Sequence, residues 1–330
     1  MSCSVRLVHL VRWLLPSFLF VHCLCGKDKP LEPVEPVVVC DGGIPYVNKS
    51  NAQRFGLYSE TLTDDYATNL NSLIATFGVK PAYVLWFIQI DDTFPATFII
   101  GNTLQSISTV ISMNIRSKKL DLVQNLSVLH EISLGRWDTT LHSFARQAAQ
   151  LGTVFYFRFG FEMNINWFPW DNKPDDFVHA WNHTHKIFEE EKATNVVWVF
   201  SPGVLFDTMT FQGSILPYYP GDSVVDITGL DGYNFGDRYD IWHHWETFSQ
   251  VFGKSLIELK KLGKPIWITE TGCVSDRSRP GWLEDLFQFM DANPCIGAML
   301  WFNAKNGNEP DFRLESDSSS LECMRNWIGK

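Results

Sequence analysis

Short apolar runs rich in β-branched and aromatic residues recur along the chain, and each is followed by a stretch whose apolar positions have helical spacing. This alternation is typical of parallel βα units, in which a helix covers the strand that precedes it. Eight runs are expected to form strands: residues 54–58, 83–90, 109–115, 153–160, 195–201, 225–232, 265–270 and 296–302.

The stretches between the runs include two clear amphipathic helices, at residues 141–152 and 246–264, and a glycine near the end of each provides a helix stop. Eight alternations favour a closed (β/α)8 TIM barrel of the α/β class. An open doubly wound sheet is the alternative, but it should carry a glycine-rich phosphate-binding turn after an early strand, and the sequence has no such motif. We therefore expect a single barrel domain at residues 40–330.

Residues 1–25 have the order of a secretory signal peptide, because Arg6 and Arg12 precede the apolar stretch WLLPSFLFV and smaller residues follow it. A retained membrane anchor is the alternative, but the apolar stretch is short and Pro16 interrupts it. Residues 26–39 contain three prolines and mixed charges, which favours a linker or N-terminal tail. We expect a secreted, extracellular protein.

Composition narrows the range of partners. Hydrophobic residues make up 45% of the chain, with 25 Phe and 13 Trp, which is enough for a large core and for exposed aromatic platforms. The formal net charge of -10 argues against a nucleic-acid partner, because binding to phosphates needs clustered Lys and Arg. A neutral substrate fits better. After cleavage of the signal peptide we expect no membrane contact, and we expect a monomer.

The cysteines beyond the signal segment are even in number, which suits an oxidising compartment: Cys40, Cys273, Cys295 and Cys323. In a barrel, Cys273 and Cys295 would lie at opposite ends of the strands, too far apart for a disulfide. We expect Cys295 to pair with Cys323, and Cys40 with Cys273. Three Asn-X-Ser/Thr sequons are candidate glycosylation sites: Asn48, Asn125 and Asn182.

Two glutamates stand at the ends of expected strands. Glu162 follows the fourth run and Glu270 closes the seventh, and catalytic residues of a (β/α)8 barrel gather at these carboxyl ends. A retaining glycoside hydrolase needs two carboxyl groups about 5 to 5.5 Å apart, one as acid/base and one as nucleophile. Aromatic neighbours of Glu162 favour its protonated form, whereas Thr269 and Thr271 flank Glu270. The alternative for either glutamate alone is a loop charge or a helix cap.

Aromatic side chains near the two glutamates are candidate sugar platforms, because a sugar ring presents an apolar C–H face. The candidates are Trp167, Trp170, Tyr233 and Trp301. For each of them the alternative is ordinary packing in the core. Trp301, at the end of the eighth run, is the strongest candidate. We expect no metal site, since adjacent or i,i+2 histidines on helices point apart.

The segment RFGFEMNINWFPW at residues 158–170 resembles the signature R-F-x-H-E-M-N-G-x-W-x-P-W of glycoside hydrolase family 26, a mannanase-like family of retaining (β/α)8 glycosidases. Later segments follow in the family's order as far as residue 314. The resemblance implies that Glu162 is the acid/base, Glu270 the nucleophile and Tyr233 a partner of the nucleophile. It also implies supporting roles: Trp301 as the sugar platform, Trp167 and Asn166 on the leaving-group side, and Arg158 as electrostatic support.

One departure from the signature is Phe161, which replaces the histidine before the acid/base and removes a polar contact. The sequence as a whole predicts a secreted retaining endo-β-glycanase without cofactor or metal, acting on a polysaccharide and foremost on β-1,4-mannan. The alternatives are the same fold acting on β-1,3-xylan or mixed-linkage β-glucan, a catalytically silent carbohydrate-binding barrel, and a barrel enzyme that acts on another bond.

Overall fold

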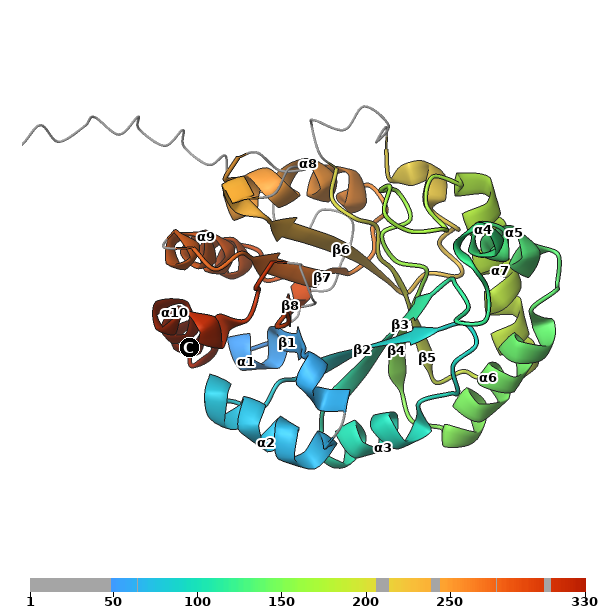
Figure 1. The fold of residues 1–330 in the computed structure, drawn as a ribbon, viewed down its shortest axis with the longest axis horizontal. Coiled ribbons are helices and arrows are strands. Elements are labelled where there is room, and N and C mark those ends of the chain that lie inside the picture. Colours follow the sequence, from blue (N-terminus) through green and yellow to red (C-terminus); the bar gives the residue numbers. More distant parts are fainter. Residues whose placement is uncertain (1–48, 64, 206–213, 239–243, 277, 306–309) are drawn as a thin grey trace, which may run out of the picture. The chain divides into compact units, whose positions relative to one another are not determined.

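Eight parallel strands close into a barrel in which each strand pairs with its neighbours in sequence and β8 pairs with β1 (Figure 1). The strands are β1 Phe55–Tyr58, β2 Tyr83–Gln89, β3 Ser108–Asn114, β4 Phe155–Phe159, β5 Val196–Phe200, β6 Ile227–Asn234, β7 Ile266–Cys273 and β8 Ile296–Phe302. Each expected run overlaps one of these strands, so the predicted (β/α)8 barrel is confirmed. The computed structural model describes residues 49–63, 65–205, 214–238, 244–276, 278–305 and 310–330, which belong to one compact unit.

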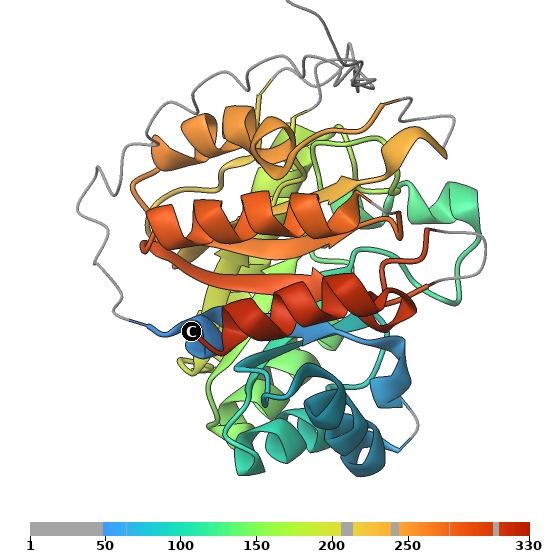
Figure 2. The same ribbon diagram turned by 90° about the vertical axis from the view of Figure 1, so that its left-hand side faces the viewer.

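Helices surround the barrel (Figure 1, Figure 2). They are α1 Asn51–Arg54, α2 Tyr66–Phe77, α3 Ala96–Leu104, α4 Leu122–Asn125, α5 Val128–Ser133, α6 Asp138–Leu151, α7 Pro174–Glu190, α8 Phe248–Lys260, α9 Arg279–Ala292 and α10 Ser318–Ile328. Both helices expected from the sequence are present, as α6 and α8, and α6 ends at Gly152, whose φ of 64° is typical of a helix stop. The C-terminal helix α10 lies beside α9 and α1 (Figure 2).

The barrel interior is apolar near the amino ends of the strands and polar near their carboxyl ends. The apolar layer consists of Tyr83, Leu85, Val110, Val199, Ile227, Trp267, Ala298 and Leu300. The buried polar side chains nearer the carboxyl ends include Ser112, Arg158, Ser201, Asp231, Thr269 and Glu270. Because a buried polar group is costly unless it is hydrogen-bonded, this polar layer requires partners within the barrel.

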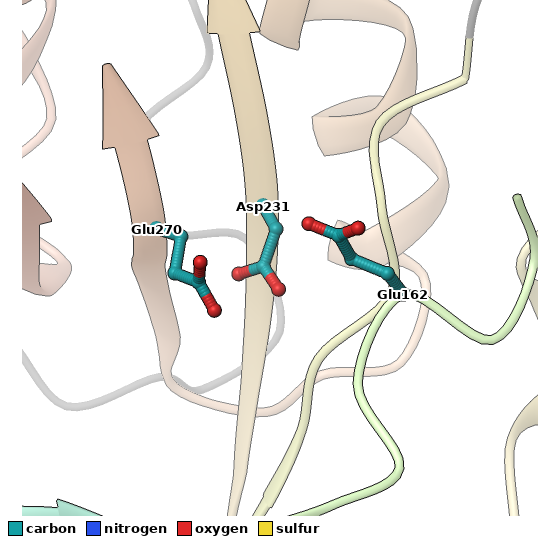
Figure 3. A group of neighbouring side chains, drawn as sticks. All are labelled: Glu162, Asp231 and Glu270. Atoms are coloured by element: carbon teal, nitrogen blue, oxygen red, sulfur yellow. The ribbon is translucent and has the colours of Figure 1, made fainter. Parts of the chain in front are cut away.

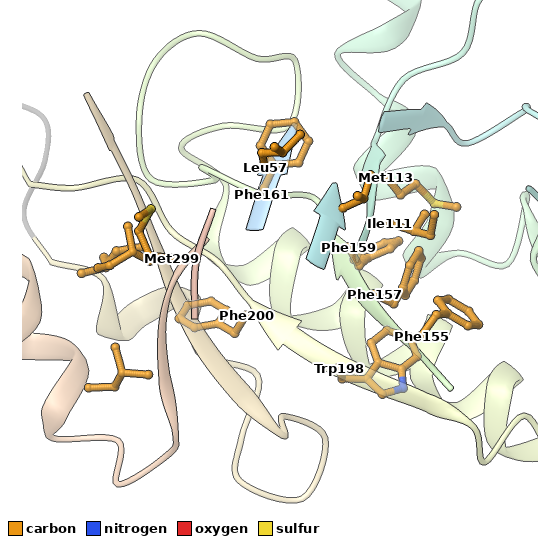
Figure 4. Packing of buried hydrophobic residues seen from close by; sticks show 14 of the residues in the cluster. Leu57, Ile111, Met113, Phe155, Phe157, Phe159, Phe161, Trp198, Phe200 and Met299 are labelled. Carbon is orange, nitrogen blue, oxygen red and sulfur yellow. The ribbon is translucent and has the colours of Figure 1, made fainter. Parts of the chain in front are cut away.

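The alternation of side chains along β4 decides which residues face the barrel interior. Phe155, Phe157 and Phe159 pack in the core between the barrel and the helices around it (Figure 4). Arg158 lies between two of them in sequence and therefore points inward, in register with Ser112 of β3. A slip of one residue would move the three aromatic rings to the wrong face, so their burial fixes the register.

The cysteine pairings expected from the sequence are wrong. Cys273 and Cys323 are free thiols, so neither the bond from Cys295 to Cys323 nor the bond from Cys40 to Cys273 is formed. Cys273 is buried at the end of β7, and its thiol contacts the carbonyl oxygen of Val274. Cys323 lies in the middle of α10, and Cys295 is itself disulfide-bonded.

The three sequons differ in their surroundings. Asn125 is buried, and its amide nitrogen donates to three backbone carbonyl oxygens, so a glycan at the expected site Asn125 is incompatible with this fold. Asn182 is half-buried on α7, and its amide donates to a carbonyl oxygen one turn earlier at 2.9 Å. Asn48 and Cys40 lie outside the described residues, as do the expected signal peptide and tail at residues 1–39. Among the described residues, no helix combines the length and apolarity that crossing a membrane requires.

Candidate active site

The loop from β4 to α7 carries Glu162 and is tightly held at its start. Glu162 has a φ of 52°, in the left-handed region that residues other than glycine rarely adopt. Its backbone nitrogen donates to the carbonyl oxygen of Ser201, just beyond β5, at 2.8 Å. Asn164 forms a two-way bond with Gly203, donating to its oxygen and accepting from its nitrogen, both at 2.8 Å. These bonds to the end of β5 stabilise the uncommon backbone conformation of Glu162.

Glu270 on β7 and Asp231 on β6 share one buried cation, Arg158 of β4. Arg158 is fully buried, and its Nη1 donates to Glu270 Oε1 at 2.5 Å while its Nη2 donates to Asp231 Oδ2. Ser112 and Ser201 accept two further bonds from this guanidinium, at 2.8 and 3.0 Å. The structure therefore places Arg158 where an electrostatic support for the nucleophile would lie.

Three carboxyl groups meet at this end of the barrel, and Figure 3 shows Asp231 standing between the two glutamates. Glu162, Asp231 and Glu270 each offer one oxygen, and the three oxygens lie within 4.8 Å of one another. Among the described residues, these are also the side chains close enough to share a metal ion. Arg158 already supplies a positive charge to two of them.

The environment of Glu162 favours its neutral form. Burial raises the pKa of Glu162 well above its usual value, and the charges of Asp231 and Glu270 raise it further. Glu162 is only 5% exposed, so water screens these charges poorly. Arg158 opposes the shift, but its guanidinium is bonded to the other two carboxyl groups. A neutral Glu162 is suited to act as an acid, and a Glu270 paired with a cation is suited to act as a nucleophile.

Tyr233 of β6 holds the second oxygen of the nucleophile candidate. Its hydroxyl donates to Glu270 Oε2 at 2.7 Å. Burial raises the pKa of Tyr233 well above its usual value and the charge of Glu270 raises it further, so the hydroxyl keeps its proton and stays a donor. With Arg158 on Oε1 and Tyr233 on Oε2, both oxygens of Glu270 are fixed. This is the partnership that the family resemblance implies for Tyr233.

A cleft opens beside the carboxyl groups. It is lined by Glu162, Ile165, Trp167, Gly203, Val204, Asp231, Gly232, Tyr233 and Phe235. Trp167 is 39% exposed, and its ring stands edge-on to that of Phe235 with 6.0 Å between the ring centroids. An exposed aromatic wall next to a carboxylic acid can take one face of a sugar ring.

Trp301 and Trp170 are not sugar platforms, contrary to the expectation from the sequence. Both are fully buried. Trp301 packs against Trp282 of α9, and its Nε1 donates to the carbonyl oxygen of Phe312 at 2.9 Å. Trp170 donates from Nε1 to the carbonyl oxygen of Phe161 at 2.8 Å, which ties the end of the loop to its start. Their polar atoms are used for internal hydrogen bonds.

Phe302 occupies the position that the sequence assigned to Trp301. The alternation along β8 turns Trp301 toward α9 and the next residue, Phe302, toward the barrel interior. Phe302 stacks on Tyr58 of β1 with 4.8 Å between ring centroids, and its ring lies 5.8 Å from that of Tyr233. Phe302 and Tyr58 are both half-buried at the carboxyl ends of their strands.

Two other residues of the signature segment have local roles. Phe161 is buried, and its ring lies over the Arg158 guanidinium at 5.0 Å, within the range of a cation–π contact. The aromatic ring thus takes the place of the family's histidine without adding a polar group. Asn166 is exposed, and its Oδ1 accepts from Asn172 Nδ2 at 3.3 Å. It is not one of the residues that line the cleft.

Two buried acids of the site were not identified from the sequence. Asp231 lies inside the sixth strand, and its burial follows from the alternation along that strand. Asp171 directly follows the signature segment and is 6% exposed, and its Oδ2 accepts from the backbone nitrogens of Trp167 and Phe168. Both acids have apolar neighbours in the sequence. This pattern could have indicated that they are buried and therefore require hydrogen-bond or ion-pair partners.

Comparisons with known sequences support the family. Residues 133–271 match the sequence profile of glycosyl hydrolase family 26. The protein named Endoglucanase H of Acetivibrio thermocellus is 31% identical over 209 residues, which cover 60% of this chain and 23% of that protein. The mannan endo-1,4-beta-mannosidase of Bacillus subtilis is 32% identical over 150 residues, which cover 42% of this chain and 36% of that protein. The chain spans well under half the length of these relatives.

Solved structures share the fold over most of the chain. A GH26 β-mannanase from Bacteroides ovatus matches with a TM-score of 0.62 at 19% identity, covering 83% of this chain and 87% of that one. GH26A from a Muricauda species matches with a TM-score of 0.60 at 18% identity, covering 85% of this chain and 91% of that one. At these identities the likeness concerns the fold.

Fold and site together define a (β/α)8 barrel with one glutamate just beyond β4 and another on β7, both beside a cleft. The matching profile covers the segment that carries both glutamates, and the fold is shared with solved members. Residues 133–271 are thus similar to glycosyl hydrolase family 26, and most of the chain shares the fold of the solved GH26 structures.

Proposed function

We propose that this chain is a secreted, retaining endo-β-glycanase that hydrolyses polysaccharides, foremost β-1,4-mannan. The observation that carries the proposal is the convergence of Glu162 and Glu270 at one cleft, with oxygens within 4.8 Å of each other. Inverting enzymes keep their carboxyl groups about 6.5 to 9.5 Å apart to admit a water molecule, whereas retaining enzymes keep them about 5 to 5.5 Å apart. The short separation supports the retaining mechanism.

The proposed reaction proceeds by double displacement. Glu162 gives its proton to the glycosidic oxygen as Glu270 attacks the anomeric carbon, so the bond to the leaving group breaks and a glycosyl-Glu270 ester forms. The Glu162 carboxylate then removes a proton from water, whose oxygen attacks the same carbon and releases Glu270. Arg158 and Tyr233 hold Glu270 for attack, and burial keeps Glu162 protonated for the first step.

The cleft offers contacts suited to a chain of sugar units. Trp167 and Phe235 line it together with Glu162, and the family resemblance implies that Trp167 lies on the leaving-group side. Phe302 and Tyr58 are not among the residues that line the cleft, but they stack beside Tyr233, which does line it, and they are the candidate platform in place of Trp301. Aromatic surfaces of this kind accept the C–H face of a pyranose on both sides of the scissile bond.

Mannan is the leading substrate because two relatives bear the name mannan endo-1,4-beta-mannosidase at 32% identity over partial lengths. A β-glucan is the second candidate, since Endoglucanase H is 31% identical over 209 residues. No observation favours β-1,3-xylan over these two substrates.

The test is a screen of the purified protein on mannan, β-1,3-xylan and mixed-linkage β-glucan, with reducing ends as the readout. Glu162→Gln and Glu270→Gln are expected to abolish product, and Asp226→Asn, at the amino end of β6, serves as the matched control that retains activity. NMR of the first product anomer should show the β-anomer, as retention requires. An α-anomer would contradict the mechanism, and binding without any product would favour the silent barrel.

Secretion, which rests on the signal-like residues 1–25, has a separate test. The full chain should appear in the medium of expressing eukaryotic cells with its new N-terminus near residue 26. Retention in the cell membrane would favour the anchor instead. Size-exclusion chromatography with light scattering of the secreted protein checks the expected monomer.

A further inference from the structure

Asp171 lies near the end of the loop that carries the acid/base candidate, and its carboxyl group accepts hydrogen bonds from the backbone of that loop. Its Oδ2 accepts from the backbone nitrogen of Trp167 at 2.6 Å and from that of Phe168 at 2.7 Å. The side chain is 6% exposed. Its other oxygen, Oδ1, is buried and meets no donor among the described residues. One oxygen therefore fixes two successive peptide groups.

The other bonds of this loop secure different points. The indole of Trp170 bonds to the carbonyl oxygen of Phe161, and the Asn172 backbone nitrogen donates to the carbonyl oxygen of Met163 at 3.0 Å. The Asn172 amide donates to the carbonyl oxygen of Ile165 at 2.9 Å. These contacts hold the start and the end of the loop. The peptide groups at its exposed tip, residues 167–168, are the ones that Asp171 holds.

Trp167 is the residue at that tip which reaches the cleft. It is 39% exposed and lines the cleft together with Glu162 and Phe235. Its ring contacts that of Phe235, with 6.0 Å between the ring centroids, and the backbone that carries the indole sets where it enters the cleft. The bond from its own nitrogen to Asp171 is the shortest that the backbone of this tip makes.

We propose that Asp171 is a positioning residue that holds Trp167 over the leaving-group side of the cleft and so sets the affinity for the sugar unit bound there. This inference rests on the proposed function, because the sugar is the ligand that an endo-β-glycanase would place beside Glu162. Asp171 is not itself one of the residues that line the cleft, so it acts through Trp167 rather than on the substrate.

A pair of substitutions separates the hydrogen bonds of Asp171 from its bulk and charge. Asp171→Ala removes both bonds, and KM for linear β-1,4-mannan is expected to rise about threefold to tenfold, the range of an aromatic stacking contact, with kcat changing less. Asp171→Asn keeps an acceptor oxygen and should restore most of the affinity. An equal loss in both variants would overturn positioning by hydrogen bonds.

A double-mutant cycle tests whether Asp171 acts through Trp167. Trp167→Ala alone should raise KM by a similar factor, and Asp171→Ala in that background should add nothing further. Independent, additive losses would overturn the inference. Asp226→Ala is the matched control, since Asp226 Oδ2 accepts from the backbone nitrogen of Trp198 at 2.8 Å away from the cleft and should leave KM unchanged.

Hydrogen exchange supplies a readout that does not need turnover. The amides of Trp167 and Phe168 should exchange faster in Asp171→Ala than in the wild type, and at nearly the wild-type rate in Asp171→Asn. If the wild type cleaves no mannan, the proposed substrate fails while this measurement still decides whether Asp171 holds the tip. Unchanged exchange in Asp171→Ala would overturn the inference even if mannan is cleaved.

Discussion

Arg158→Met removes the one cation that Asp231 and Glu270 share. At an effective dielectric constant of about 20, a charge pair at 4 Å is worth about 4 kcal/mol, and Arg158 makes two such pairs at full burial. Desolvation of the guanidinium offsets much of this energy, so removing one partner of such a buried network costs about 3 to 5 kcal/mol. Tm should then fall by roughly 6 to 20 °C.

The same substitution leaves the nucleophile candidate without its positive partner. Arg158 lowers the pKa values of Asp231 and Glu162, so its removal is expected to move the pH profile of kcat/KM to higher pH. Arg279→Met is the matched control: Arg279 is also fully buried, but it bonds to Ser320 and to the carbonyl oxygen of Arg313. It should lower Tm and leave the profile in place. A profile of Arg158→Met identical to that of the control would refute an electrostatic role.

Three further predictions follow from the site. Tyr233→Phe removes a bond to charged Glu270 worth about 1.5 to 3 kcal/mol, so Tm should fall by roughly 3 to 12 °C and kcat/KM by about tenfold to a hundredfold, and an unchanged rate would contradict this. Phe302→Ala should raise KM, whereas Trp301→Phe should lower Tm only; the reverse pattern would make Trp301 the platform. Burial raises the pKa of Asp171 to about 8, so the stability due to its neutral form is lost as pH rises from about 4 to about 8. The free energy of unfolding of the wild type should fall relative to Asp171→Asn over that window, and a constant difference would argue against it.

The strands could be predicted because the apolar runs are short, regularly spaced and buried on both faces. The run at residues 109–115, for example, forms β3. The two glutamates could be placed because strand ends in a parallel barrel share one edge. The prediction of the strands and that of the two glutamates depend only on positions along the sequence, and neither depends on the direction of a side chain.

Side-chain direction is where prediction from the sequence failed. Trp301 and Phe302 are adjacent aromatics, and only the register of β8 in the barrel determines which one faces inward. The sequence likewise predicts that Trp170 is an exposed platform, whereas its indole donates a hydrogen bond within the loop. Asp231 could not be identified from the sequence, because its place in the site depends on a bond to Arg158, which is 73 residues away in sequence.

The disulfide pairing failed for a related reason. Pairing two cysteines requires Cα atoms within about 7 Å, and the sequence gives no distances between a strand end and a helix position. Cys323 lies in the middle of α10, a position that the spacing of the cysteines does not reveal. The free thiol of Cys273 has its own contact at the end of β7.

Three carboxyl groups lie close enough to compete for the role of nucleophile, and a covalent trap distinguishes them most directly. A 2-deoxy-2-fluoro-β-mannoside with a good leaving group should form an ester that is released slowly, because fluorine destabilises the positively charged transition state of both steps. Peptide mass spectrometry is predicted to find the sugar on Glu270. Attachment to Asp231 or Glu162 instead, in a protein that cleaves mannan, would contradict the assignment of acid/base and nucleophile.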